Sequence, residues 1–307
     1  MAEAGGSDLQ AELPPAWPGS DVRVGETVMH VRRAPSTSDN AEPAVFLHGL
    51  GGGSASFTDV MAALRDRLEC FAPDLPGFGQ SQPPADGDYS FDAQAAATTA
   101  FIDRHVGAPV HLVGNSVGGS VAVRVAVDSP RLVRTLTLVS PALPDLRPRL
   151  GPYMVLVPLV PLVGPAFMRR ASRIAPQEQA RRTLEGLFGD VARIRQERLD
   201  ETAEEIRVAA GMAHTENAYL GALRSVLNEY LRRGPRSLWR QARSVRAPTL
   251  VVYGSADPMV DARLAGRAAR AFAGSTVLVL SGVGHVAQLE APDTVATAIR
   301  ALLDRTG

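Results

Sequence analysis

The sequence predicts an α/β protein with a mostly parallel central sheet, helices on both faces of the sheet and an inserted helical segment. Short, continuously apolar runs alternate with helical patterns over residues 21–140 and again over 246–307, as buried parallel strands and their crossover helices do. Between residues 141 and 245 the strand pattern stops, and helical stretches follow one another with Pro and Gly between them. We therefore expect one α/β core in two parts, interrupted by a helical cap, after a flexible N-terminal tail over residues 1–20.

The expected elements alternate in chain order. Strands are predicted in "VMHVRRA", "PAVFLHG", "ECFAPD", "PVHLVG", "VRTLTLVSP", "PTLVVYG" and "STVLVLSG". Core helices are predicted in "SFTDVMAALRDRL", "FDAQAAATTAFIDRHV", "VGGSVAVRVAVDSP", around residues 261–272 and near 294–303. The inserted helices are predicted in "RASRIAPQEQARRTLEGLF", "DVARIRQERLDETAEEIRVAAGM" and "NAYLGALRSVLNEYLRR".

Composition excludes several classes of function. The 307 residues have a net charge of zero and no basic run, which argues against a nucleic-acid partner. All 32 basic residues are Arg, so neither a Schiff-base lysine nor the lysine of a phosphate-binding loop is present. The chain shows no metal-ligand pattern, and we expect neither a metal nor a cofactor. Cys70 is the only cysteine and the N-terminus has no apolar signal, so we expect a cytoplasmic protein.

Ser116 lies in the pattern G-x-S-x-G, formed by "GNSVG" over residues 114–118. The pattern stands between a predicted strand and a predicted helix. A sharp strand-to-helix turn there would raise the serine above the sheet, and the glycines would allow the backbones to pass closely. The serine would also lie at a helix N-terminus, where backbone N–H groups stabilise negative charge. Ser116 is therefore the candidate nucleophile.

A nucleophilic serine requires a base and a group that orients the base. His285 follows a strand in the loop "SGVGH" and is the candidate base; His30 and His111 lie in predicted strands, and His105 and His214 are expected in solvent. Asp257, in "YGSADPMV", also follows a strand and is the candidate acid. The chain order is then Ser, Asp, His.

With these segments, and with "FLHGLGG" and "PDLPGFGQS" before them, the chain resembles the serine hydrolases of the α/β-hydrolase fold, esterase- or lipase-like with a helical cap. The resemblance covers the chain from about residue 22 to its end. It implies that the backbone N–H groups of Leu50 and Val117 form an oxyanion hole. It also implies structural roles for His48 and Asp74, and it leaves Asp145 as a lesser candidate for the acid.

Other functions remain open. Meta-cleavage-product hydrolases, which cut carbon–carbon bonds, share the "GNSVGG" pattern, although their glycine-rich segment is usually followed by a proline that "HGLGGGSAS" lacks. Thioesterase, lactonase and cofactor-free haloperoxidase activities use the same triad. Dehalogenases and epoxide hydrolases carry an aspartate where Ser116 stands. A dinucleotide fold fails because Ser54 replaces its third glycine, and a non-catalytic receptor is disfavoured because no triad member is missing.

The most apolar run, "YMVLVPLVPLVGPAFM" over residues 153–168, is too short and too rich in Pro for a membrane span. It could pack inside the cap, dock on a membrane with flanking Arg147, Arg149, Arg169 and Arg170, or line an acyl pocket. We favour packing combined with pocket lining. The candidates for contact with substrate are Tyr153, Met154, Leu156 and Leu159.

Together these features predict a cofactor-independent carboxylic-ester hydrolase. It would act on a small apolar ester, with water as the second substrate, through an acyl-enzyme intermediate.

Overall fold

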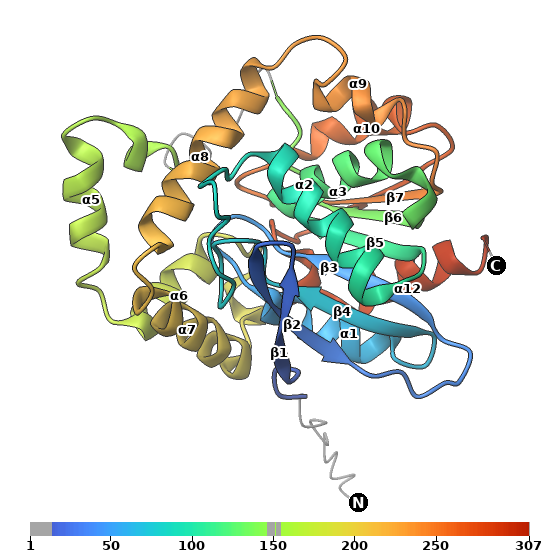
Figure 1. The fold of residues 1–307 in the computed structure, drawn as a ribbon, viewed down its shortest axis with the longest axis horizontal. Coiled ribbons are helices and arrows are strands. Elements are labelled where there is room, and N and C mark those ends of the chain that lie inside the picture. Colours follow the sequence, from blue (N-terminus) through green and yellow to red (C-terminus); the bar gives the residue numbers. More distant parts are fainter. Residues whose placement is uncertain (1–13, 146–150, 152–154, 307) are drawn as a thin grey trace, which may run out of the picture.

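A computed structural model describes residues 14–145, 151 and 155–306 of the chain. Most of the expected N-terminal tail lies outside the described residues. In the described parts, eight strands form one sheet in the order β1-β2-β4-β3-β5-β6-β7-β8 (Figure 1). The strands are β1 (Gly19–Val24), β2 (Thr27–Ala34), β3 (Glu42–Leu47), β4 (Leu68–Pro73), β5 (Val110–Asn115), β6 (Val133–Val139), β7 (Thr249–Gly254) and β8 (Thr276–Leu280).

The strands from β3 to β8 are parallel to one another, and the antiparallel pairings are those of β2, with β1 on one side and β4 on the other. The predicted mostly parallel sheet is therefore confirmed. The strand β1 was not expected from the sequence; it begins within the expected tail at Gly19 and forms a hairpin with β2. Its side chains are mostly exposed, so it lacks the apolar run that predicts the buried strands.

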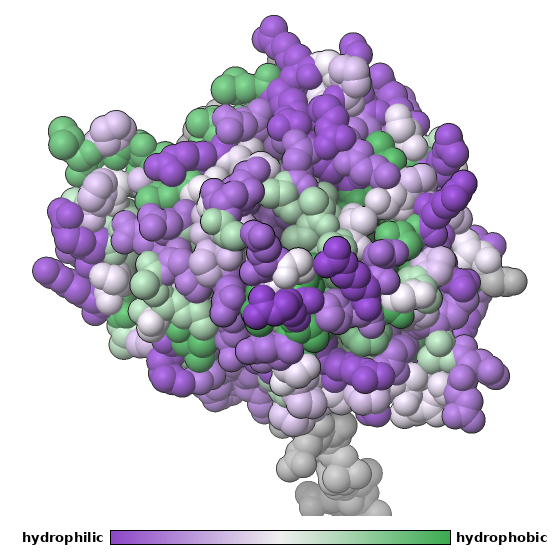
Figure 2. All heavy atoms as spheres, in the orientation of Figure 1, coloured by the Kyte–Doolittle hydropathy of each residue, from purple (hydrophilic) through white to green (hydrophobic). Residues whose placement is uncertain are grey.

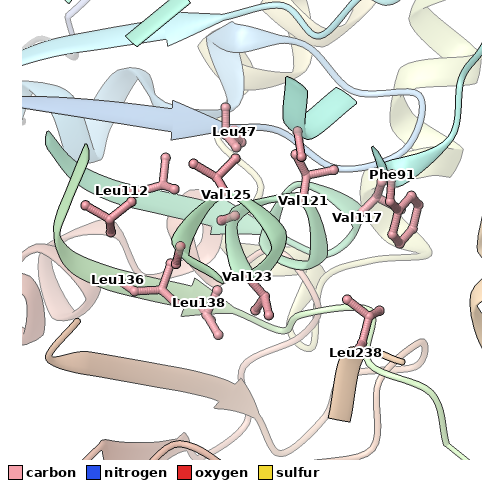
Figure 3. Close-up of a cluster of buried hydrophobic side chains, with 14 of the residues drawn as sticks. Leu47, Phe91, Leu112, Val117, Val121, Val123, Val125, Leu136, Leu138 and Leu238 are labelled. Atoms are coloured by element: carbon pink, nitrogen blue, oxygen red, sulfur yellow. The ribbon is translucent and has the colours of Figure 1, made fainter. Parts of the chain in front are cut away.

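Helices cover both faces of the sheet, as expected. The helices α1 (Thr58–Leu64), α11 (Ala287–Glu290) and α12 (Pro292–Leu303) pack on one face. The helices α2 (Phe91–Phe101), α3 (Val117–Asp128), α9 (Leu238–Ala242) and α10 (Ala265–Ala271) pack on the other. Figure 3 shows how α3 fills the second face: Val121 and Val125 lie among Leu47 and Leu112 of the strands and form one apolar cluster.

Between β6 and the short helix α9, residues 155–237 of the described chain contain four α-helices. They are α5 (Val163–Ala171), α6 (Pro176–Glu185), α7 (Gln196–Ala210) and α8 (Thr215–Leu231). They stand beside the sheet at one side of the molecule, and α5 is the outermost of them (Figure 1). The helix α9 packs on α3 and belongs to the core cluster through Leu238 and Ala242.

The parallel strands bring distant loops together at one edge of the sheet. Leu47 at the end of β3 is paired with Gly114 of β5, and Asn115 with Val139 at the end of β6. Val139 is paired in turn with Val252 of β7. Because carboxyl ends of parallel strands share an edge, the loops after β3, β5, β7 and β8 meet there, where ligands of open α/β sheets bind.

Candidate active site

Ser116 occupies the turn between β5 and α3 on a backbone that is rare for a residue with a side chain. Its φ is 53° and its ψ is −117°. The turn is held on both sides: the Ser116 N–H donates to Val139 O at 3.0 Å, and Ser116 O accepts from Ala142 N at 2.9 Å. Strained backbone of this kind costs about 1–3 kcal/mol and persists where the surroundings over-determine it. The turn therefore presents the hydroxyl above the sheet edge.

The glycines beside Ser116 are required by close backbone approach. A Cβ at Gly118 would stand 2.3 Å from Leu47 O, and one at Gly114 would stand 2.5 Å from Gly118 O. Neither carbonyl can move without disrupting the sheet or α3. The pattern G-x-S-x-G thus has the physical cause that the sequence analysis assigned to it.

His285 and Asp257 are brought together at the same edge. His285 Nδ1 lies 2.9 Å from Asp257 Oδ2 and 3.1 Å from Oδ1. The Asp257 side chain is fully buried, so it is held in place. Its Oδ1 also accepts hydrogen bonds from Met259 N at 2.7 Å and Val260 N at 2.9 Å. With the carboxylate acting as acceptor, Nδ1 carries a proton and Nε2 is left free to accept one.

The surroundings of Asp257 favour its ionised form. Burial alone raises the pKa of this carboxyl, but the adjacent His285 lowers it, as do the Val260 N–H and the Ser140 hydroxyl. The net pKa lies below the ordinary value. An aspartate that stays ionised can orient the imidazole and stabilise its charged form.

The loop after β3 lies directly against Ser116. A Cβ at Gly49 would stand only 3.2 Å from the Ser116 Cβ. Within the described residues, neither the Leu50 N–H nor the Val117 N–H donates a hydrogen bond to another group of the protein. Two N–H groups beside the serine are therefore available to an oxygen that develops negative charge.

His48 and Asp74 have the structural contacts that the resemblance implied. His48 is buried, its Nδ1 bonds to Gly49 O at 2.8 Å, and its Nε2 accepts from Leu75 N at 2.9 Å. Asp74 accepts from Ser54 N at 2.7 Å and from Gln80 N at 2.9 Å. Both side chains fix the loops on either side of the candidate oxyanion segment.

The other candidates make contacts outside the proposed triad. Asp145 contacts Arg263 at 2.6 Å, whereas Asp257 contacts the histidine. His30 bonds to Asp21, and His111 bonds to Thr135 and Glu42. His105, as expected, is exposed.

Glu290 is a buried carboxylate that sequence reasoning missed. Its Oε2 accepts from Gly284 N at 2.7 Å and from Gly189 N at 2.9 Å, and its Oε1 accepts from Asp190 N at 3.0 Å. The adjacent His285 N–H donates to Leu187 O at 2.7 Å. The residues after α6 are thus tied to the histidine loop. Sequence could not single out Glu290, because two of its three partners, Gly189 and Asp190, lie about a hundred positions earlier in the chain.

Two other side chains of the insertion reach the loop after β3. Tyr219 of α8 lies over Gly51, since a Cβ there would be 3.2 Å from its ring. Glu205 of α7 accepts from Ala55 N at 3.1 Å, and burial, assisted by the charge of Asp74, raises the pKa of Glu205 to about 8. Of the predicted substrate contacts, Leu156 and Leu159 are partly buried. Tyr153 and Met154 lie outside the described residues.

Comparison with known proteins identifies the family. The family model of the alpha/beta hydrolase fold matches residues 43–292. The chain is 29% identical over 250 residues to the dihydrolipoyllysine-residue acetyltransferase component of the acetoin cleaving system of Cupriavidus necator, covering 81% of this chain but only 60% of that protein. It is 25% identical to Lipase 1 of Psychrobacter immobilis, covering 86% of this chain and 78% of the lipase. A crystal structure of a membrane phospholipase A superposes with a TM-score of 0.76 at 23% identity, covering 95% of this chain and 87% of that one.

The chain therefore belongs to the α/β-hydrolase fold family, and the predicted fold is confirmed. Lipases among its relatives support hydrolase as its enzyme class. In the parts of the chain that the structure describes, none of the helices combines the length and apolar composition of a membrane span.

Proposed function

We propose that the protein is a cofactor-independent serine hydrolase that cleaves carboxylic esters with apolar acyl or alcohol groups. Ser116 Oγ attacks the ester carbonyl carbon while His285 Nε2 accepts its proton. The Leu50 and Val117 N–H groups donate to the resulting oxyanion. When the carbon–oxygen bond breaks, His285 returns the proton to the alcohol. Water then attacks the acyl-enzyme with His285 again as the base, which releases the acid and restores Ser116.

The observation that carries this proposal is the convergence of three chain segments on one sheet edge. Ser116 stands on its strained turn so close to Gly49 that a Cβ there would crowd the serine, while His285 is oriented by the buried Asp257. Such an arrangement matches acyl transfer, in which a base and an oxyanion site must flank one nucleophile. Similarity to Lipase 1 supports an ester as the substrate. The first half of the apolar run, in which Leu156 and Leu159 are partly buried, supports acyl groups without charge.

A substrate panel with matched serine variants tests the proposal. Wild-type protein is assayed on p-nitrophenyl esters of increasing acyl length, a thioester, a lactone and a dienone meta-cleavage product. We expect kcat/KM to rise from acetyl to medium-chain esters, by at most about four-fold per buried methylene, which corresponds to about 0.8 kcal/mol. Ser116→Ala should abolish ester turnover without unfolding the protein.

Ser120→Ala is the control for the loss of a serine near the site. Ser120 lies one turn along α3 and donates to Ala142 O at 2.9 Å, so its loss removes a buried hydrogen bond but no reacting group. Its kcat should stay within a few-fold of wild type. Turnover of the dienone with none of the esters would replace the proposal by carbon–carbon bond hydrolysis. A flat or falling acyl series would show that the insertion does not line an acyl pocket.

A further inference from the structure

The outer part of the insertion exposes large apolar side chains to solvent. We call residues 157–173 the arm; it consists of a short 3-10 helix (Val157–Leu159) and α5. At its tip, Leu162 is 90% exposed, Val163 53% and Val160 46%, and Phe167 one turn into α5 is 43% exposed. Figure 2 shows this apolar tip projecting from a mostly hydrophilic surface. The expected packing of the run in the interior is therefore wrong for its second half.

The tip is held in a strained conformation. Leu162 has φ 66° and ψ −39°, and the Val163 N–H donates to Pro161 O at 2.8 Å. These values define a γ-turn with positive φ at its central residue, a rare turn that is costly for a residue with a side chain. The turn points the most exposed leucine of the tip into solvent. Both the strained turn and the exposed apolar side chains are unfavourable for folding. Exposed apolar patches of this kind mark surfaces that bind a partner.

The charges of the arm are all of one sign. Residues 157–173 contain Arg169, Arg170 and Arg173 and no Asp or Glu, in a chain whose total charge is zero. The three arginines are exposed, and no ion pair joins any of them to another described residue. By contrast, Arg181 and Arg182 of the next helix both pair with Glu178. The arm therefore combines an apolar tip with a free basic cluster.

The arm also stands apart from the body of the protein. Its 3-10 helix contacts α8, and α5 packs mainly on that 3-10 helix (Figure 1). Arg169 follows Val163 by six residues, which is about 9 Å along a helix axis at 1.5 Å per residue. Apolar groups of interfacial segments enter a bilayer by roughly 5–10 Å. When the tip is inserted, the arginines would thus lie level with the lipid head groups.

We propose that the arm docks the protein on an anionic lipid surface. Leu162, Val163 and Val160 enter the boundary of the acyl chains, and Arg169, Arg170 and Arg173 bind the head-group phosphates. The free basic cluster favours an anionic bilayer over an apolar protein partner, because a purely apolar partner would leave the arginines unpaired. This inference uses the arm alone and does not depend on the activity of Ser116.

Vesicle sedimentation tests the proposal directly. Ser116→Ala protein, in which no lipid can be hydrolysed by that serine, is mixed with vesicles of phosphatidylcholine alone or with 30% phosphatidylglycerol. We expect binding to the anionic vesicles that weakens with salt, and little binding to phosphatidylcholine. Arg169→Gln with Arg170→Gln should reduce the affinity for anionic vesicles roughly 30-fold, at about five-fold for each arginine.

Two further variants separate docking from folding. Leu162→Gly relieves the strained turn, so its Tm should equal or exceed that of the parent while vesicle binding falls several-fold. Arg240→Gln with Arg270→Gln removes two exposed charges from the core helices and should leave binding unchanged.

Equal binding by the arm and core variants, or absence of binding to anionic vesicles, overturns the proposal. A dimer by light scattering that Leu162→Gly abolishes would identify a second copy as the occupant instead. The proposed function is tested separately, by measuring ester turnover of the same arm variants in protein that retains Ser116.

Discussion

The floor of the candidate site and the arm are built in opposite ways. The floor consists of the loops that carry Leu50, Ser116, Asp257 and His285. Its backbones approach so closely that Gly118 could not carry a Cβ, and the Asp257 carboxylate accepts from two backbone N–H groups. The arm exposes Leu162 and leaves its arginines unpaired within the described residues. Rigid elements hold reacting atoms in place, whereas an exposed element can meet a partner.

The helices α7 and α8 of the insertion are fastened to the core. Asp59 of α1 binds Arg198 of α7 at 3.0 Å, and Arg124 of α3 binds Glu229 of α8 at 2.9 Å. Glu205 and Glu290 make further links to the loops of the floor. The inner helices of the insertion are thus tied to the core and to the loops of the candidate site, whereas the arm presents apolar side chains to solvent.

The largest effect on kcat is expected for Asp257, the candidate acid of the site. Asp257→Asn should lower kcat by about 10³–10⁴-fold, because the amide no longer holds His285 in the tautomer that leaves Nε2 free. Asp145→Asn provides the matched control. Its carboxylate binds Arg263, so kcat should stay within a few-fold of wild type. The two variants are compared by steady-state kinetics on one ester, and a reversed order would assign the acid to Asp145.

A smaller effect is expected at Glu290, which joins the insertion to the loop of His285. In Glu290→Gln, the amide has one oxygen for the three N–H groups that the carboxylate accepts, so at least one of them loses its partner. If Glu290 positions the histidine loop, kcat should fall about ten-fold with little change in KM.

Glu229→Gln is the control, because this buried carboxylate also joins the cap to the core but lies with Arg124. It should lower Tm and leave kcat nearly unchanged. If both variants lose stability alone, with identical kcat, Glu290 has no positioning role.

The smallest effect is a pH dependence of stability. The pKa of Glu205 is raised to about 8, so the folded protein holds this proton more tightly than the unfolded chain does. The stability from this group is therefore complete below pH 4.5 and is lost as pH rises through 8. Glu205→Gln mimics the protonated acid. Its Tm should match wild type near pH 5 and exceed it by a few degrees near pH 8.

Glu204→Gln tests whether that trend belongs to Glu205. Glu204 is exposed, and its bond to Arg207 lowers its pKa. Its Tm difference from wild type should not grow in the same direction between pH 5 and pH 8. If it does, the trend reflects the net charge of α7 and not the carboxyl of Glu205.

Local pattern located the turn of Ser116 and the loops that bring Asp257 and His285 together. The nucleophile turn requires glycine at fixed positions and lies between a strand and a helix, so its sequence marks Ser116 directly. Asp257 and His285 follow strands of one parallel sheet, which places them at one edge. Glu290 and Tyr219 escaped prediction because their partners are loops far away in the chain. The exposure of Leu162 was not predicted either, because the sequence of an apolar run does not show whether its side chains are buried or exposed.

Covalent labelling tests directly whether Ser116 is an activated nucleophile. Wild-type protein is treated with a fluorophosphonate, whose phosphorus is attacked by an activated serine with loss of fluoride. Activation of Ser116 by His285 predicts one adduct by intact mass, located at Ser116 by peptide mapping, slower labelling of Asp257→Asn and no labelling of Ser116→Ala. An unlabelled wild type, or an adduct that persists in Ser116→Ala, would contradict it.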